Sequence, residues 1–160
     1  MRRPLLVLLL LATIAVTWAQ AAFAAVHWPS GGSKRNHDSR VQKLTRRVVT
    51  YARHQIGVAY SWGGTSRATG YDCSGLVYAA YRSIGWKIPR SSWDQLRAGR
   101  PVRFARLRPG DLLFTEGGGH VQLVVSKRTA ISAPQTGERV RYVPLTQLRP
   151  EFAGARRLLR

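Results

Sequence analysis

Two residues in this sequence could together carry nucleophilic chemistry: Cys73, the only cysteine of the chain, and His120. A lone thiol cannot form a disulfide within the chain, so it is either a small buried apolar side chain or a reactive group. Cys73 directly follows Asp72, a residue type preferred at helix N-caps, and it opens an apolar run. We therefore expect Cys73 at a helix N-terminus, where the helix dipole lowers the thiol pKa well below about 8.5.

A cysteine nucleophile needs a base, and the chain has four histidines. His27 and His37 lie in a polar, turn-rich stretch, and His54 has the surroundings of a surface residue on a helix. His120 follows three glycines and begins a strongly apolar strand, where a polar residue needs a reason. The alternative to a base is a histidine on an edge strand with ordinary hydrogen bonds. The presence of Cys73, which needs a base, favours the interpretation of His120 as that base.

The N-terminus has the pattern of a secretory signal sequence. A short basic segment, Met1–Arg3, precedes an apolar segment, Leu5–Val16, and Ala22-Phe23-Ala24 offers a cleavage site of the A-x-A type. We predict a signal peptide over residues 1–24, and export to the periplasm, the extracellular space or the cell envelope. The alternative is an uncleaved anchor, because residues 4–26 carry no charge and are about long enough to span a bilayer.

The chain is strongly basic, with 26 Lys and Arg, 7 Asp and Glu, and a net charge of +19. Removal of residues 1–24 takes away two arginines and no acid, which leaves +17. Such a surface attracts anionic partners. No nucleic-acid motif accompanies the charge, so we expect anionic envelope polymers and no specific nucleic acid. A membrane is expected as a partner only if the signal segment stays uncleaved.

Apolar spacing divides the remaining chain into a linker and one folded domain. Residues 25–43 are polar and turn-rich, which predicts a flexible linker, and 44–160 form the domain. Helical periodicity predicts helices over 44–56 and 73–84 and a short helix that ends near Leu96.

After a turn at residues 108–111 the pattern becomes that of β-strands. The predicted strands are Leu112–Thr115, His120–Ser126, Thr129–Ser132, Val140–Val143 and Ala155–Leu159. Helices followed by strands predict an α+β fold, in which helices pack on an antiparallel sheet.

Several short segments carry a family resemblance. They are Ala59–Gly64 (AYSWGG), Tyr71–Leu76 (YDCSGL), Pro89–Ser92 (PRSS), Arg108–Leu112 (RPGDL), Gly119–Val121 (GHV) and Ala133–Gly137 (APQTG). In this order and spacing they resemble the NlpC/P60 peptidases of bacterial cell walls, from about Leu44 to Leu159. The resemblance implies a papain-like fold with the cysteine at a helix N-terminus and the histidine on the facing sheet.

The resemblance also implies a reaction and its residues. The substrate would be an amide in peptidoglycan stem peptides, most often the bond between D-glutamate, through its γ-carboxyl, and a diamino acid. Cys73 would attack the carbonyl, and His120 would activate the thiol and protonate the leaving amine. The N–H of Cys73 is a candidate oxyanion donor, with Tyr60 as a second.

Three further residues match family positions that line the substrate groove: Asp72, Ser74 and Arg90. Arg90 would suit a substrate carboxylate, and its alternative is a solvated surface arginine. No cofactor is expected. A metal site is disfavoured, because one cysteine and dispersed histidines offer no ligand spacing.

One position departs from the family pattern. Members usually have a histidine, asparagine or glutamine twelve residues after the catalytic histidine, and here that position is Ser132. We expect Ser132 to serve as the third catalytic residue by accepting a hydrogen bond from Nδ1–H of His120. Gln122 stands where a small residue is usual and could orient His120 instead.

Two other functions fit the same residues. The domain could be a weakly active or noncatalytic module that binds peptidoglycan or an anionic polymer, which would need no reactive thiol. It could also catalyse another acyl transfer with the same Cys–His pair.

Overall fold

The computed structural model describes residues 32–160, with side chains from Asn36 onward. Asn36–Arg160 forms one compact unit. The predicted signal sequence, 1–24, and the first part of the predicted linker, 25–31, lie outside the described residues. Between residues 32 and 160, no helix has the length and apolar character needed to cross a membrane.

The first helix, α1, spans Gly32–Arg53 and begins twelve residues before the predicted domain start at residue 44. Its C-terminal half packs on the core through Val48 and Ala52, which are fully buried. Residues 36–40 are all exposed, so no apolar contact holds them in the helix. Extension of an existing helix adds one hydrogen bond for each residue fixed, which explains why a polar segment continues it. Residues 32–43 are therefore helical, where the sequence predicted a flexible linker.

The second helix, α2, spans Cys73–Arg82 and starts at the predicted residue. Asp72 is its N-cap, because its side chain accepts a hydrogen bond from the N–H of Gly75. Leu76, Val77 and Ala80 are buried on its inner face. A short helix, α3, follows at Ser92–Arg97, capped by Ser91.

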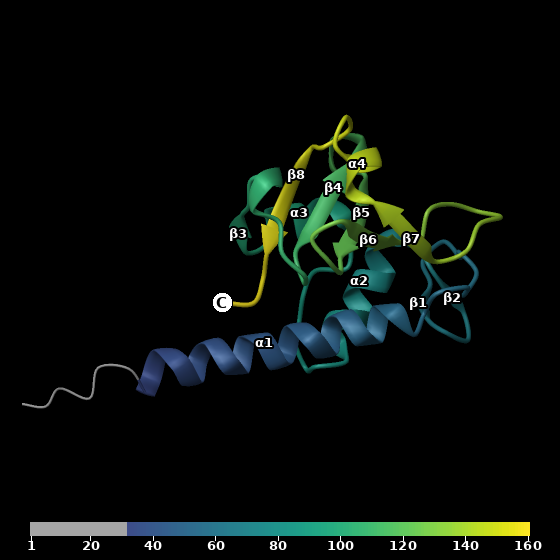
Figure 1. Cartoon of the computed structure of the whole chain (residues 1–160). Helices are drawn as coiled ribbons and strands as arrows, with labels where there is room; N and C mark the ends of the chain where they lie inside the picture. The colour runs from purple at the N-terminus through teal and green to yellow at the C-terminus, as the bar shows by residue number, and fades with distance from the viewer. Residues whose placement is uncertain (1–31) are drawn as a thin grey trace, which may run out of the picture. The chain divides into compact units, whose positions relative to one another are not determined.

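A six-stranded antiparallel sheet has the order β3-β8-β4-β5-β6-β7 (Figure 1). Its strands are β3 (Arg100–Pro101), β4 (Leu112–Thr115), β5 (His120–Val124), β6 (Thr129–Ser132), β7 (Arg141–Pro144) and β8 (Gly154–Arg157). A separate hairpin pairs β1 (Thr65–Ser66) with β2 (Gly70–Tyr71). Two 3₁₀ turns, η1 (Phe104–Arg106) and η2 (Glu116–Gly118), and a short helix, α4 (Leu145–Leu148), complete the order.

These elements confirm the predicted α+β fold. Strands β4 and β6 have the predicted bounds, and β5 ends two residues early. Strands β7 and β8 begin one residue away from their predicted starts. The two-residue strands β1, β2 and β3 and the helix α4 were not predicted, because elements so short have no period to detect.

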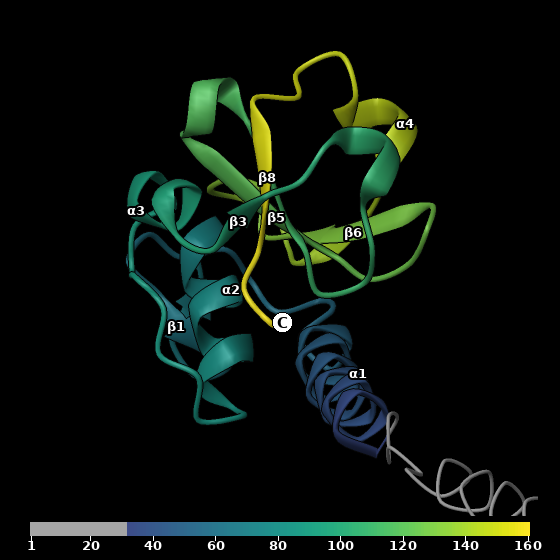
Figure 2. The ribbon, with the colours of Figure 1, turned by 90° about the vertical axis from the view of Figure 1, so that its left-hand side faces the viewer.

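The sheet has an apolar layer on each face. Val121, Leu123 and Ile131 belong to the main core, which also contains the buried side chains of α1 and α2. Leu113 and Val124 belong to a second cluster, with Phe104 of η1 and Leu148 of α4 packed against it. Figure 2 shows α4 across the sheet from α2. The alternation of side chains along β4 and β5 thus supplies both layers.

The close contact between α2 and the loop before β1 gives a stability prediction. A Cβ added at Gly75 would overlap the carbonyl oxygen of Gly64 and crowd the Asp72 carboxylate. Gly75→Ala should therefore cost about 1–3 kcal/mol or more in the free energy of unfolding, although alanine favours helix. Gly85→Ala is the control, because Gly85 has φ +77° and open space around it. The control should lose about 1–2 kcal/mol from backbone strain alone. Urea denaturation measures both, and a stabilised Gly75→Ala variant would contradict the contact.

Candidate active site

Cys73 is the first residue of α2, and its side chain is partly exposed. The Asp72 carboxylate fixes this helix start by accepting from the N–H of Gly75 at 2.6 Å. Backbone N–H groups at the start of the helix then face the sulfur, including those of Cys73 and Ser74. The predicted position of the thiol at a helix N-terminus is observed.

The electrostatic prediction for Cys73 is wrong in sign. Burial raises the pKa of the thiol, and the negative charge of Asp72 raises it further. The N–H groups of Val121, Ser74 and Cys73 lower the pKa, but by less than burial raises it. The net pKa therefore lies above the ordinary value, because the loss of hydration destabilises the thiolate more than the three N–H groups stabilise it.

His120 begins β5, where its ring is bonded to Ser132 on β6. His120 Nε2 and Ser132 Oγ are 2.8 Å apart, and Ser132 is buried. The sequence interpretation named the correct pair but the wrong nitrogen, since it assigned Nδ1. With Nε2 on the serine, Nδ1 is the nitrogen left for another partner. When Nε2–H donates to Ser132, Nδ1 is the unprotonated, basic nitrogen.

Burial also sets the charge of His120. It lowers the pKa of the imidazole, and the carboxylates of Glu116 and Glu151 oppose this with a smaller effect. The ring is therefore neutral at neutral pH, when the Cys73 thiol also keeps its proton. The two groups rest as a neutral pair and not as a thiolate and an imidazolium.

Gln122 is hydrogen-bonded to Thr115, and not to His120, which the sequence analysis considered as its partner. Its Nε2 donates to Thr115 Oγ1 at 3.1 Å, and its buried Oε1 has no hydrogen-bond partner among the described residues. Thr115 pairs with His120 across β4 and β5. Gln122 thus contacts the strand neighbour of the histidine, and Ser132 contacts its ring.

The link between Cys73 and β5 is a backbone contact. The N–H of Val121, the residue after His120, interacts with the sulfur and lowers its pKa. No hydrogen bond joins the side chains of Cys73 and His120 in the part of the chain that the structure describes.

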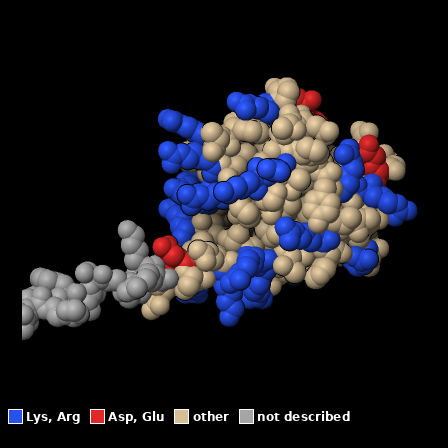
Figure 3. Space-filling model, in the orientation of Figure 1, with Lys and Arg blue, Asp and Glu red and all other residues tan. Residues whose placement is uncertain are grey.

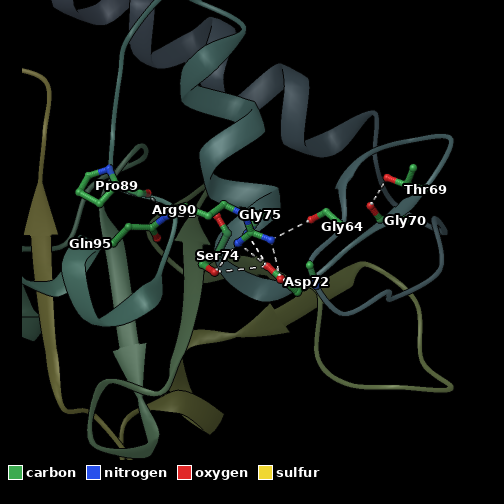
Figure 4. Close-up of polar contacts among 10 residues, drawn as sticks. Gly64, Thr69, Gly70, Asp72, Ser74, Gly75, Pro89, Arg90 and Gln95 are labelled. Atoms are coloured by element: carbon green, nitrogen blue, oxygen red, sulfur yellow. Dashed lines mark hydrogen bonds and ion pairs between the residues drawn. The ribbon is translucent and has the colours of Figure 1, made fainter.

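Asp72, Ser74 and Arg90 form one hydrogen-bonded network beside the thiol (Figure 4). Arg90 pairs with both carboxylate oxygens of Asp72, at 2.6 Å to Oδ2 and 3.0 Å to Oδ1. It also donates to Ser74 Oγ at 2.9 Å and to the carbonyl of Gly64 at 3.4 Å. The N–H of Gly63 completes the set by donating to Asp72 Oδ2 at 2.8 Å.

This network keeps Asp72 ionised. Burial raises the pKa of its carboxyl. The hydrogen bonds from Arg90, Gly75 and Gly63 together lower the pKa by more than burial raises it, so the net pKa is below the ordinary value. Both Nη atoms of Arg90 are already bonded to the protein. The expected capture of a substrate carboxylate by this arginine would therefore need its remaining Nε–H. The contact of these three residues with substrate stays a prediction.

Tyr60 lies near the same charges and is partly exposed. Burial raises the pKa of its hydroxyl, as do the negative charges of Cys73 and Asp72, while Arg90 lowers it. The hydroxyl therefore keeps its proton at neutral pH and can donate a hydrogen bond. This property fits the oxyanion donor expected from the sequence.

Two residues of α3 were missed by the sequence analysis. Gln95 is fully buried and donates to the carbonyls of Ser74, at 3.1 Å, and Pro89, at 2.9 Å. Ser92 donates to the carbonyl of Gly119, directly before His120, at 3.0 Å. Helix α3 thus ties the segment after Cys73 to the segment before His120. A glutamine in a short amphipathic helix gave no signal of this role.

No three His, Cys, Asp or Glu side chains within the described range cluster in a way that could hold a metal ion.

Comparison with known proteins identifies relatives of this chain. The model of the NlpC/P60 family matches residues 57–156, which contain the thiol, the histidine and Ser132. Murein DD-endopeptidase MepH of Escherichia coli is 38% identical over 133 residues, which are 77% of this chain and 49% of that protein. The γ-D-glutamyl-L-lysine dipeptidyl-peptidase of Bacillus subtilis is 39% identical over 98 residues, 58% of this chain and 33% of that protein.

A solved structure supports the same relation. The peptidoglycan hydrolase RipB of Mycobacterium tuberculosis superimposes with a TM-score of 0.69 at 33% identity, over 76% of this chain and 68% of that one. This chain spans about half of the length of the E. coli relative and a third of the B. subtilis one.

The raised pKa of Cys73 predicts how the thiol reacts. Only the thiolate is alkylated, so labelling by iodoacetamide should be slow at neutral pH and should rise with pH above about 8.5. Intact-mass spectrometry over a pH series measures the rate, and the urea-unfolded chain serves as the control with an ordinary thiol. A rate that is already constant below pH 7 would contradict the neutral pair.

Proposed function

The chain belongs to the NlpC/P60 family, and from this premise we propose that it is a cysteine peptidase that hydrolyses amide bonds in peptidoglycan stem peptides. The observation that carries the proposal is the position of Cys73 at the start of α2, packed against the core cluster that contains Val121, the residue after His120. This contact brings the thiol to the strand that begins with His120, whose Nδ1 is left unbonded by the Ser132 contact.

Acylation begins from the neutral pair. As the Cys73 sulfur attacks the carbonyl carbon of the substrate, Nδ1 of His120 takes the thiol proton. The carbonyl oxygen becomes an oxyanion, which the Cys73 N–H and the Tyr60 hydroxyl stabilise as donors. Proton transfer during attack avoids a buried thiolate in the resting enzyme, and this suits a thiol whose pKa is raised by burial.

The tetrahedral intermediate then breaks at the C–N bond. His120 gives its proton to the departing amine, and a thioester remains on Cys73. Water attacks the thioester with His120 again as the base, and the products are a free carboxylate and the original thiol. Ser132 holds the ring by accepting from Nε2–H throughout, so that Nδ1 keeps facing the reacting groups.

We further propose that the bond cleaved joins the γ-carboxyl of D-glutamate to a diamino acid. The name of the B. subtilis relative supports this bond, whereas the name of the E. coli relative points to a DD bond. The two activities leave different products. Cleavage at the γ-glutamyl bond shortens each stem to two residues, and cleavage of a DD cross-link separates dimers without shortening the donor stem to two residues.

The proposal includes location. Peptidoglycan lies outside the cytoplasmic membrane, so the enzyme must be exported to meet it, and the signal sequence predicted at residues 1–24 would provide the export. The positive charge of the surface favours retention near anionic envelope polymers. Figure 3 shows Lys and Arg spread over one face, with Asp and Glu confined to small areas.

The reaction can be tested on purified peptidoglycan. Incubation with the wild-type chain should release shortened stems, which mass spectrometry of the soluble muropeptides identifies by bond. Cys73→Ala should release none and keep the folded circular dichroism spectrum. Equal binding by both proteins without any product would instead identify a noncatalytic wall-binding module.

The Ser132 contact predicts a kinetic effect. Ser132→Ala should lower kcat about ten- to a hundredfold, which is about 1.4–2.7 kcal/mol, and leave KM nearly unchanged. Gln122→Ala is the matched control, because Gln122 bonds Thr115 and not the ring of His120. Its kcat should fall less than that of Ser132→Ala. A silent Ser132→Ala with a strong loss in Gln122→Ala would assign the orientation of His120 to the glutamine.

A further inference from the structure

A hollow of about 910 Å³ lies apart from Cys73, between η1, the turn from β5 to β6 and the start of α4. Five exposed cations line it: Arg106, Arg108, Lys127, Arg128 and Arg149. None of its lining residues is acidic. None of the five pairs with a carboxylate within residues 36–160. We call this site the basic hollow. Because the charges of the five cations have no carboxylate partner among these described residues, they are available to a ligand.

Apolar side chains also line the basic hollow, including Phe104, Leu107 and Leu145. Leu145 is buried in the second apolar cluster, with Phe104 and Leu107 packed against it. The guanidinium of Arg149 lies over the ring of Phe104, 5.5 Å from its centre. The lining thus combines cations with apolar surface.

This combination selects the chemistry of the ligand. Guanidinium groups bind carboxylates in a planar, two-point geometry, so the charges favour an anionic ligand. A wholly hydrophilic polyanion would leave the apolar lining unused. A short peptide with free carboxylates and small apolar side chains satisfies both parts.

The basic hollow lies away from the proposed catalytic residues along the sheet. His120 begins β5, and Lys127 and Arg128 follow its other end. Five residues of strand at about 3.3 Å each place these positions roughly 16 Å apart. The lining includes neither Cys73 nor His120. A ligand held in the hollow would therefore leave the thiol free.

We propose that the basic hollow is a second binding site for the carboxylate-bearing stem peptides of peptidoglycan, separate from the site of hydrolysis. This inference rests on the proposed function, which gives the protein a polymer with many such stems. A stem bound in the hollow keeps neighbouring stems at a high effective concentration near Cys73. The hollow thus acts as a point of attachment to the wall.

Binding to insoluble peptidoglycan tests the site without hydrolysis. The full chain with Cys73→Ala is co-sedimented with peptidoglycan from which phosphate-bearing polymers have been removed. Addition of Arg128→Gln and Arg149→Gln should weaken binding about tenfold, because two of the five cations are lost. The matched control is Arg82→Gln with Lys87→Gln, which removes the same charge from exposed residues outside the hollow. The control should change binding less than twofold.

Kinetics supply a second readout. In the wild-type background, Arg128→Gln with Arg149→Gln should raise KM for polymeric peptidoglycan and leave KM for a small soluble muropeptide unchanged. Equal weakening by the two charge pairs would reduce the effect to general electrostatics and overturn the site. Unchanged sedimentation of the hollow variant would overturn it too, as would binding only to peptidoglycan that retains phosphate polymers. If the wild-type chain cleaves nothing, the proposed function fails, while sedimentation still decides whether the hollow binds stems.

Discussion

The Asp72 carboxylate is the interaction on which the candidate site depends. It caps α2 through the N–H of Gly75, holds the loop before β1 through Gly63, and pairs with both Nη atoms of Arg90. These contacts come from three separate parts of the chain. Loss of the carboxylate would free the helix start that carries Cys73 and would leave Arg90 without its partner. The Asp72 side chain thus fixes both the position of Cys73 and the conformation of the loop around it.

The same carboxylate has an electrostatic cost for the thiol beside it. An ionised Asp72 next to a partly buried sulfur disfavours a second negative charge, and burial acts in the same direction. Burial also disfavours the charged form of His120. Burial thus disfavours the charged forms of both Cys73 and His120.

The sheet separates two kinds of surface. Strand β5 starts at His120, one of the proposed catalytic residues. Its other end leads into the turn that borders the basic hollow. Helix α3 stiffens the first region, because Gln95 and Ser92 bond the segments next to Ser74 and His120. Among the described side chains, the cations of the basic hollow make no such hydrogen bonds, and they are exposed. One short strand therefore connects the proposed catalytic residues with the basic hollow.

The sequence by itself determined the features that depend on local chemistry. Asp72 before Cys73 predicted the start of α2, and the change to a β-type pattern after the turn at residues 108–111 predicted β4 and β6 with their bounds. The family resemblance placed a polar residue twelve positions after the histidine, which pointed to Ser132, and the structure joins the two side chains.

Tertiary structure decided the rest, because spacing contains no information on burial or on which atoms meet. Desolvation reversed the expected pKa shift of Cys73, and packing between β5 and β6 placed Nε2 of His120, and not Nδ1, on the serine. Arg90 met Asp72 because the chain returns past the helix start eighteen residues later. Helix α1 began early because a helix nucleated on the core continues through polar residues that have no apolar period of their own.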